Sequence, residues 1–335
     1  MEHCALPTTV DRAIACLKGV ATGDAIGKQT EMLPHDEVRR WYPEGVRGFE
    51  GVPGEIIPRY VGNRKHQWRI AETTDDTERT LAVARAILAN GTVSHVSIGR
   101  EMLGCTKCVH PGVASLWEFH QAADPARVAT AHDGCGAAVR VAPVGIIHPS
   151  ESLDDLVSAA REASISTHGG SLGIAGAAAV AGAVSAAVDG ATPSLILERA
   201  EHAASMAESR ERRAPALGRA IRSVHEVLAD LPQLSAAEIA ARCFPDHPLT
   251  IVPLALGLAT LLTSAEQGIL LAANIGGDSD SVASIAGGIL GAMYPSTVNE
   301  DWHQIVDRIN RLDLVPLGEA LARRRSRARA IGRRY

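Results

Sequence analysis

The sequence predicts an all-α fold that forms a single domain, and two features of the chain lead to this prediction. Nearly every segment with a regular hydrophobic pattern has Ala, Leu or Ile at positions i, i+3 and i+4, the spacing of one face of an α-helix. The sustained alternation of apolar and polar residues that marks β-strands is absent from the sequence. With 335 residues, of which 46% are hydrophobic and 21% charged, the chain can bury a large core. We therefore expect a globule of a dozen or so helices.

The clearest predicted helices, in chain order, are residues 10–25, 77–89, 153–164, 172–188, 194–208, 217–229, 236–242, 252–263, 282–293 and 301–311. One of them lies in an uncharged stretch of 20 residues, 169–188, which is long enough to cross a bilayer. That stretch consists mainly of Ala, Gly and Ser, with few of the large apolar residues that favour membrane insertion. We expect it to be a buried central helix, and we expect no membrane partner.

The N-terminus and the charge balance indicate a cytoplasmic protein that does not bind nucleic acid. The first residues lack the basic segment and apolar run of a signal peptide. A formal net charge of -5 gives no electrostatic reason for a nucleic-acid partner. The six cysteines form no dense disulfide framework. Cys105 and Cys108 form a CxxC pair, but no second pair completes a zinc site, so neither a metal nor a redox role is expected there.

The C-terminal segment 323–334 contains seven arginines. A run of like charges is usually a solvated helix end or tail, with a basic contact patch as the alternative. We therefore predict a helical domain over residues 1–322 and a basic tail over residues 323–335.

One segment does not read as helix. Between residues 43 and 62, eight of twenty residues are Gly or Pro, which excludes a continuous helix. Aromatic residues lie in or beside it, namely Trp41, Tyr42, Phe49, Tyr60 and Trp68. The segment is either a long surface loop held to the core by its aromatic side chains, or a lid that stacks on a planar group of the substrate.

Two acidic clusters, each at the start of a predicted helix, are the strongest chemical signal in the chain. They are TTDDT at residues 73–77 and GGDSDS at residues 276–281. Simple capping needs only one such residue per helix, whereas two adjacent carboxylates repel unless a positive charge lies between them. The helix dipole supplies only about half an elementary charge, while Mg²⁺ and Mn²⁺ carry two charges and prefer oxygen ligands. The sequence therefore predicts that the two clusters meet around divalent metal ions.

A third segment, GVATGDAIG at residues 19–27, precedes Glu31. Its glycines fall on every fourth residue, so they share one helix face and let another backbone approach closely. Helix packing alone is one explanation of this pattern. The functional interpretation is that Asp24 is a supporting carboxylate behind the metals and that Glu31 is a base beside them.

Together these segments resemble the ADP-ribosylglycohydrolase family. The matching pieces span almost the whole chain: GVATGDAIG with Glu31, TTDDT, GCGAAVRVAPVG at 134–145, STHGG around His168, and NIGGDSDSVASIAGGILGAMY at 274–294. The resemblance implies an orthogonal all-α bundle with two Mg²⁺ or Mn²⁺ ions in a central cleft. It also implies a hydrolase that cleaves a ribosyl bond through an oxocarbenium-like transition state, with an ADP-ribosylated protein or a small ribosyl compound as its partner.

The resemblance further implies roles for particular residues. The metal ligands would be Thr74, Asp75, Asp76, Asp278, Asp280 and Ser281, with Ser281 in place of the more usual Thr. Glu31, Asp75 and Asp280 would take part in catalysis, with Glu31 near the scissile bond. The residues at the substrate would be Asp24, His132, Asp133, Gly134, Cys135, Gly136 and His168.

The sequence departs from many relatives in the turn at residues 132–136, which contacts the diphosphate of ADP-ribose through backbone N–H groups in the family. Cys135 replaces the Asn of many relatives, and Asp133 would bring a negative charge close to the diphosphate. Such a like-charge contact costs on the order of 1 kcal/mol or more near a surface. The alternative is that Asp133 points to solvent. The segment 105–120 also lacks the Asp-x-Gly-x-Thr-Thr pattern common at the equivalent place.

Three functions therefore remain open on the sequence alone. The first is hydrolysis of ADP-ribose from a protein side chain or a small ADP-ribosyl compound. The second is hydrolysis of a smaller nucleoside or nucleotide, which Asp133 and Cys135 would favour. The third is a structural role without catalysis, as in the J-type crystallins of the family, against which the full set of expected metal ligands argues. The acceptor residue, the choice of Mg²⁺ or Mn²⁺ and the oligomeric state stay open.

Overall fold

Helices make up nearly all of the regular structure in the computed structural model, which describes residues 6–56, 68–211 and 216–332. Over these residues there are seventeen α-helices, one short 3-10 helix and no strand, apart from an isolated bridge between Ile56 and Arg69. The predicted all-α class is confirmed. In chain order the helices are α1 (Thr9–Gly27), α2 (His35–Trp41), α3 (Asp75–Asn90), α4 (His95–Met102), α5 (Ala114–Ala122), α6 (Gly136–Val139), α7 (Ala142–Ile147), α8 (Leu153–Ser164), α9 (Ser171–Val188), α10 (Pro193–Arg210), α11 (Leu217–Ala229), α12 (Ala236–Cys243), α13 (Pro248–Leu261), α14 (Ala265–Ile275), α15 (Ser279–Met293), η3 (Pro295–Thr297), α16 (Glu300–Asn310) and α17 (Leu314–Gly332).

Each predicted helix is present, and two of them, α8 and α11, have the predicted bounds. Helix α3 ends at Asn90, and Gly91 after it takes the left-handed conformation with φ 81°, which is typical of a glycine that ends a helix. The helices that the periodicity did not predict are α2, α4, α5, α6, α7, α14 and α17. The first five of these have four to nine residues, so each shows too few turns for a hydrophobic period to be recognised.

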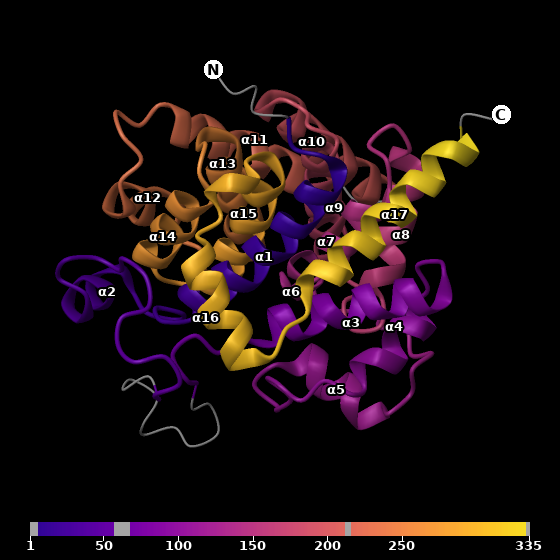
Figure 1. Ribbon diagram of the computed structural model, residues 1–335, viewed down its shortest axis with the longest axis horizontal. Coiled ribbons are helices and arrows are strands. Elements are labelled where there is room, and N and C mark those ends of the chain that lie inside the picture. The colour runs from indigo at the N-terminus through magenta and orange to yellow at the C-terminus, as the bar shows by residue number, and fades with distance from the viewer. Residues whose placement is uncertain (1–5, 57–67, 212–215, 333–335) are drawn as a thin grey trace.

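Helix α9 lies in the interior of the molecule, between α7, α8 and α10 (Figure 1). Among the described residues it is the one helix long and apolar enough to cross a membrane, and 89% of it is buried inside the protein. Its small residues permit close packing, since a Cβ added at Gly182 would lie 3.0 Å from the backbone oxygen of Arg199 in α10. The predicted buried central helix is confirmed.

Helices α1 and α15 run antiparallel in direct backbone contact, near the centre of Figure 1. A Cβ added at Gly19 would lie 2.1 Å from the backbone oxygen of Gly287, and one added at Gly23 would lie 2.2 Å from that of Ala283. At the end of α1, a Cβ on Gly27 would lie 2.5 Å from the Cα of Asp280. The glycine face of α1 therefore brings the C-terminal end of that helix to the N-terminal end of α15.

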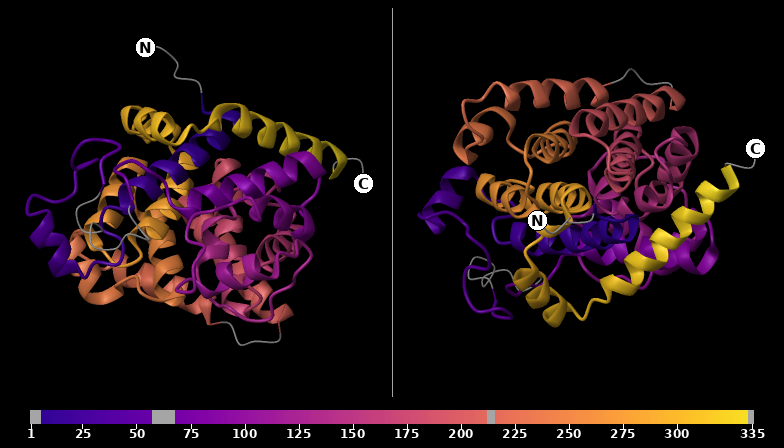
Figure 2. Two further views of the ribbon diagram at one scale, coloured as in Figure 1. Left: turned by 90° about the horizontal axis from the view of Figure 1, so that it is seen from below. Right: turned by 45° about the horizontal axis from the view of Figure 1, so that its top comes forward.

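Helix α17 runs along one face of the molecule as a single long element (Figure 2). It continues through residue 322, where a basic tail was expected to begin. The expectation of solvated arginines is wrong at Arg325, whose side chain is fully buried. Its guanidinium donates to the backbone oxygens of Gly145 and Ser185 at 3.0 Å and pairs with Asp189. Arg323 and Arg327, by contrast, are exposed, as predicted.

Candidate active site

Three helix ends meet at one place, and each carries one of the polar motifs. The close contact of α1 with α15 sets the segment around Glu31 beside the start of α15, where Asp278, Asp280 and Ser281 lie. The start of α3, with Asp75 and Asp76, joins them through the side chain of Asp24 in α1. Both α3 and α15 therefore direct their positive N-terminal ends at the acidic cluster, which favours negative charge there.

Asp24 connects α1 to the start of α3. Its carboxylate is fully buried and accepts from the backbone N–H of Thr74 at 3.0 Å and of Thr77 at 3.1 Å, as well as from the Thr77 hydroxyl. Burial raises the pKa of the Asp24 carboxyl, although these hydrogen bonds oppose the rise. Asp24 does not line the cavity, so it lies behind the site as a supporting carboxylate rather than at the substrate.

The two acidic clusters touch each other. The hydroxyl of Ser281 in α15 donates to Oδ2 of Asp76 in α3 at 3.2 Å, across a sequence separation of 205 residues. Asp280 accepts from the backbone N–H of Ser281 at 3.0 Å. The sequence-based prediction that residues near both ends of the chain meet in one cluster agrees with this contact.

Burial and mutual repulsion raise the pKa of two carboxyl groups in the cluster. Burial is the main cause that raises the pKa of Asp76 well above its usual value, and the charges of Asp280 and Asp75 add to the rise. Burial likewise raises the pKa of Asp280, with Asp278 adding to it and Lys28 opposing it. Buried carboxylates that repel one another are costly unless a cation or a proton compensates them, so the cluster has the electrostatics of a cation site.

The carboxylate and hydroxyl oxygens of the two clusters are ligands that suit a hard divalent cation, although they do not all converge on one point. Among the described residues, no three His, Cys, Asp or Glu side chains converge closely enough to enclose an ion. Two of the expected ligands, Thr74 and Ser281, are hydroxyls and do not belong to those four residue types. Two oxygens at right angles on one cation, each about 2.1 Å from it, lie roughly 3.0 Å apart. The 3.2 Å between the Ser281 and Asp76 oxygens matches that separation.

A cavity of about 230 Å³ opens onto this cluster. It is lined by Glu31, Asp75, Asp76, Arg79, Val113, Ser115, Leu116, Gly134, Cys135, Gly136, Arg140, His168, Asp278, Asp280 and Ser281. Five of the six expected metal ligands are in this set, and the sixth, Thr74, instead caps α3 by accepting from the Asp76 N–H at 3.1 Å. A larger hollow of about 460 Å³ between the end of α3, α8 and α17 contains neither acidic cluster. The smaller cavity is therefore the candidate active site.

Glu31 lies on the wall of the cavity, directly after α1. Its carboxylate forms an ion pair with Lys28, whose side chain is only 5% exposed. The Lys28 ammonium in turn lies 4.5 Å from the centre of the Trp68 ring, which also faces Lys107 at 5.5 Å. Such cation–π contacts hold an ammonium in place, so the loop that carries Trp68 helps to position the partner of Glu31.

The aromatic residues in and beside segment 43–62 that the structure describes differ in exposure. Trp68 is buried, whereas Trp41 is 44% exposed. Because the ammonium groups of Lys28 and Lys107 both lie over the Trp68 ring, the ring already has cations as partners in place of a planar substrate group. Tyr60 and the rest of 57–67 lie outside the described residues, so the proposed lid stays a prediction.

Three of the five residues in the turn 132–136 line the cavity, and the other two do not. Gly134, Cys135 and Gly136 line the cavity, and a Cβ on Gly136 would lie 3.1 Å from the His168 ring. His168 is buried, its Nδ1 is 2.8 Å from the Thr167 hydroxyl, and burial next to Arg140 lowers its pKa well below the usual value. The imidazole that lines the cavity is therefore uncharged at neutral pH.

His132 and Asp133 do not line the cavity. The His132 ring pairs with Glu118 at 2.9 Å. Asp133 is exposed, and its carboxylate accepts from the backbone N–H of Leu172 at 2.8 Å and Gly173 at 3.3 Å. It therefore caps the N-terminus of α9, and the expectation that its charge faces the diphosphate position is corrected. The sequence did not reveal this contact because the cap comes from a residue 39 positions away in the chain.

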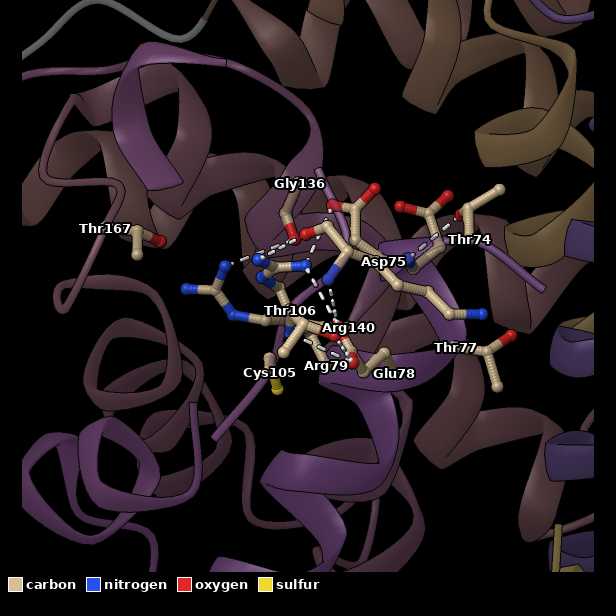
Figure 3. A network of polar contacts seen from close by, with 12 residues as sticks. Thr74, Asp75, Thr77, Glu78, Arg79, Cys105, Thr106, Gly136, Arg140 and Thr167 are labelled. Atoms are coloured by element: carbon tan, nitrogen blue, oxygen red, sulfur yellow. Dashed lines mark hydrogen bonds and ion pairs between the residues drawn. The ribbon is translucent and has the colours of Figure 1, made fainter. Parts of the chain in front are cut away.

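Two arginines that the sequence analysis did not single out line the same cavity (Figure 3). Arg140 is buried and donates to the backbone oxygens of Ala163 and Ser164 at 3.0 Å. Arg79 is 2% exposed, with Nη1 3.3 Å from Asp75 Oδ2, and its Nε has no hydrogen-bond partner among the described residues. The sequence did contain one indication that Arg79 belongs to the site. Arg79 follows Asp75 by one helical turn, which places both side chains on one face of α3.

The free cysteines of the CxxC pair form no disulfide and no metal cluster among the described residues. Burial raises the pKa of both thiols, and at Cys108 the neighbouring Asp75 adds to the rise.

Comparison with known proteins identifies the family. A profile of the ADP-ribosylglycohydrolase family matches residues 5–330. The chain is 28% identical to the uncharacterized protein YegU of Escherichia coli, over 96% of this chain and 99% of that protein. It is 24% identical to the mouse ADP-ribosylhydrolase ARH3, over 92% and 90% of the two chains. A solved structure described as an ADP-ribosylglycohydrolase-related protein complex superposes with a TM-score of 0.70 at 25% identity, over 95% of this chain and 99% of that one. The chain belongs to the ADP-ribosylglycohydrolase family, and it is a hydrolase of the glycohydrolase class.

Proposed function

We propose that this protein is a metal-dependent hydrolase that releases ADP-ribose by cleaving its ribosyl N- or O-glycosidic bond to a protein side chain or a small acceptor. The observation that carries the proposal is the single cavity in which both aspartate clusters, Glu31 and the turn 134–136 meet. Asp75, Asp76, Asp278, Asp280 and Ser281 would hold two Mg²⁺ or Mn²⁺ ions. When bound, these ions supply the positive charge that orients ribose hydroxyls and acidifies a water molecule.

The residues of the chain perform the remaining steps. Glu31, held by Lys28, takes a proton from the attacking water or gives one to the leaving group. The uncharged His168 and the turn 134–136 supply polar contacts without adding charge. Asp24 keeps the start of α3 in place by bonding its backbone N–H groups.

The charge of the cavity supports an anionic substrate. Its wall has five carboxylates and two buried arginines, Arg79 and Arg140. With two divalent ions bound, the wall would have one positive charge in excess, which favours a diphosphate over a neutral riboside. Because Asp133 bonds to α9 and does not line the cavity, the main reason to prefer a small neutral nucleoside is removed.

A substrate panel tests this function. Arginine- and serine-linked ADP-ribosyl peptides, free ADP-ribosyl compounds and neutral nucleosides are each incubated with the protein, with and without EDTA. We expect release of ADP-ribose that EDTA abolishes and that Mg²⁺ or Mn²⁺ restores. Hydrolysis of nucleosides alone would favour the N-riboside alternative, and a protein that binds metal but hydrolyses nothing would favour a structural role.

Variants of the acidic cluster provide a second test of the proposed function. Asp278→Asn and Asp75→Asn should lose both metal binding and turnover while the far-ultraviolet circular dichroism stays helical. Asp301→Asn, at an exposed aspartate of α16, is the matched control and should keep both. Unchanged metal stoichiometry in both cluster variants, measured by calorimetry, would refute the ligand assignment.

A further inference from the structure

The thiol of Cys135 lies among the proposed metal ligands, on the wall of the active-site cavity. Its Sγ is 3.1 Å from Oδ2 of Asp278 and 3.8 Å from Oγ of Ser281. Cys135 directly precedes α6, and the adjacent glycines at 134 and 136 pack against the ring of His168. The turn therefore holds the sulfur toward the start of α15, where three of the expected ligands lie.

These separations are the ones expected between two ligands of a single cation. A sulfur about 2.3 Å and an oxygen about 2.1 Å from one ion, at right angles, lie roughly 3.1 Å apart. At the wider tetrahedral angle the same two donors lie roughly 3.6 Å apart. The two distances from Cys135, 3.1 and 3.8 Å, are close to these values. No side-chain rearrangement of several ångströms is needed for the sulfur to reach an ion held by Asp278 and Ser281.

We propose that Cys135 is a sulfur ligand of the metal centre and that it shifts the preference of this site toward softer divalent cations than an all-oxygen site would bind. The inference rests on the proposed metal-dependent function and deepens it. As the metal–sulfur bond forms, the thiol proton leaves to solvent, and neither the metal nor the sulfur changes oxidation state. Thiolate ligands favour ions such as Co²⁺, Zn²⁺ and Cd²⁺, whereas Mg²⁺ gains nothing from them.

Cobalt gives a spectroscopic test that does not depend on turnover. The full-length protein, cleared of metal with EDTA and dialysed, is titrated with Co²⁺ while its absorption spectrum is recorded. We expect a thiolate-to-cobalt charge-transfer band in the near ultraviolet that grows together with the weak visible bands of bound Co²⁺. Cys135→Ser should keep the visible bands and lose the charge-transfer band, and Cys135→Asn should do the same.

Calorimetry with two ions gives an independent readout. The affinity for Cd²⁺ should fall by about tenfold or more in Cys135→Ser, whereas the affinity for Mg²⁺ should stay within about threefold. Cys243→Ser, which removes a buried thiol of α12 that does not line the cavity, is the matched control and should change neither.

The outcomes separate this inference from the proposed function. Visible bands of bound Co²⁺ that vanish in Asp278→Asn, without any charge-transfer band in the native protein, would refute the sulfur ligand and leave the metal site standing. A charge-transfer band that persists in Cys135→Ser and disappears in Cys108→Ser would also refute it, because Cys108 faces Asp75. Failure of the native protein to bind Co²⁺, Cd²⁺, Mg²⁺ or Mn²⁺ would overturn both proposals.

Discussion

The carboxylates of Asp24, Asp76 and Glu31 lie within one small region but have different partners. Asp24 is surrounded by backbone and hydroxyl donors of the α3 start, so it holds a turn. Asp76 faces another carboxylate and the Ser281 hydroxyl, so it is suited to a cation. Glu31 is paired with a lysine on the cavity wall, so it is placed to exchange a proton. The same functional group, a carboxylate, thus serves three purposes according to its neighbours.

Replacing Glu31 tests the proton role. Glu31→Gln keeps the size of the side chain but removes its ability to take up a proton, so turnover should fall by roughly 10² to 10⁴. Metal binding should remain, because Glu31 is not among the proposed ligands. Steady-state kinetics with calorimetry in parallel measures both. Glu44→Gln, whose side chain is 81% exposed, should behave as the native protein. Native turnover in Glu31→Gln would show that another group handles the proton.

Replacing Asp133 tests its place in the structure. Because its carboxylate caps α9, Asp133→Ala should lower the free energy of unfolding by about 0.5 to 2 kcal/mol. Asp133→Asn should leave the affinity for ADP-ribose unchanged, since the side chain does not line the cavity. A tenfold gain in ADP-ribose affinity at low salt, about 1.4 kcal/mol, would contradict this and show that the charge acts on the diphosphate.

At the scale of the elements, backbone contact between α1 and α15 decides where the site lies. The glycines of α1 remove the side chains that would separate the two helices, and the antiparallel arrangement sets the end of one at the start of the other. Helix α17 makes a second long-range contact, in which Arg325 bonds the backbone of α7 and α9. These contacts join segments that are far apart in the chain.

The contact of α1 with α15 can be tested by adding one methyl group. Gly23→Ala places a Cβ 2.2 Å from the Ala283 backbone oxygen, so the helices must separate. We expect a loss of about 1 to 3 kcal/mol in unfolding free energy, together with weaker metal binding because Asp24 moves with α1. Gly176→Ala in α9 is the matched control, since its Cβ meets only ordinary contacts at 3.5 Å or more. Equal stability of the two variants in urea would contradict the packing argument.

The buried pair of Arg325 with Asp189 gives a prediction that depends on pH. Removing the guanidinium leaves a carboxylate with 10% exposure, so Arg325→Met should cost about 3 to 5 kcal/mol at pH 7. Burial alone would raise the pKa of Asp189, but the bonds and charge of Arg325 lower it overall. The ion pair therefore contributes fully to the free energy of unfolding when the pH is above 3.8, the ordinary pKa of an aspartate. This contribution is lost as the pH falls through the lower pKa that Asp189 has in the folded protein.

Urea unfolding of Arg325→Met at neutral pH and below pH 3.8 measures this difference. The difference in unfolding free energy between Arg325→Met and the native protein should be smaller at the acidic pH. Arg323→Met on the same helix has a side chain that is 62% exposed, so its effect should stay within about 1 kcal/mol at either pH. A gap that does not change with pH would show that lost packing, and not the ion pair, accounts for the cost.

At the scale of the whole molecule, the candidate site joins α1, α3, α6 and α15, so the proposed metal binding would be coupled to folding. The site exists only when these elements are assembled, and ions that bind it stabilise the folded state alone. Metal at about 100 times its dissociation constant should add roughly 2.7 kcal/mol to the unfolding free energy. Thermal unfolding with EDTA, Mg²⁺ or Mn²⁺ measures the gain, and Asp278→Asn should abolish it. Equal melting temperatures with metal and with EDTA in the native protein would contradict the coupling.

The sequence by itself determined the helical class, the positions of the helices with a clear hydrophobic period, which did not include α14 and α17, and the two acidic clusters. These features are encoded locally, in hydrophobic periodicity, in glycine spacing and in adjacent aspartates, so no distant residue is needed to recognise them. Only the tertiary structure decided that Asp133 caps α9, that Arg79 and Arg140 line the cavity, that Arg325 is buried and that two lysines lie over the Trp68 ring. Each of these depends on which segments pack together. The free energy of a polar side chain is set by the partners it meets after folding, and a single sequence position does not specify those partners.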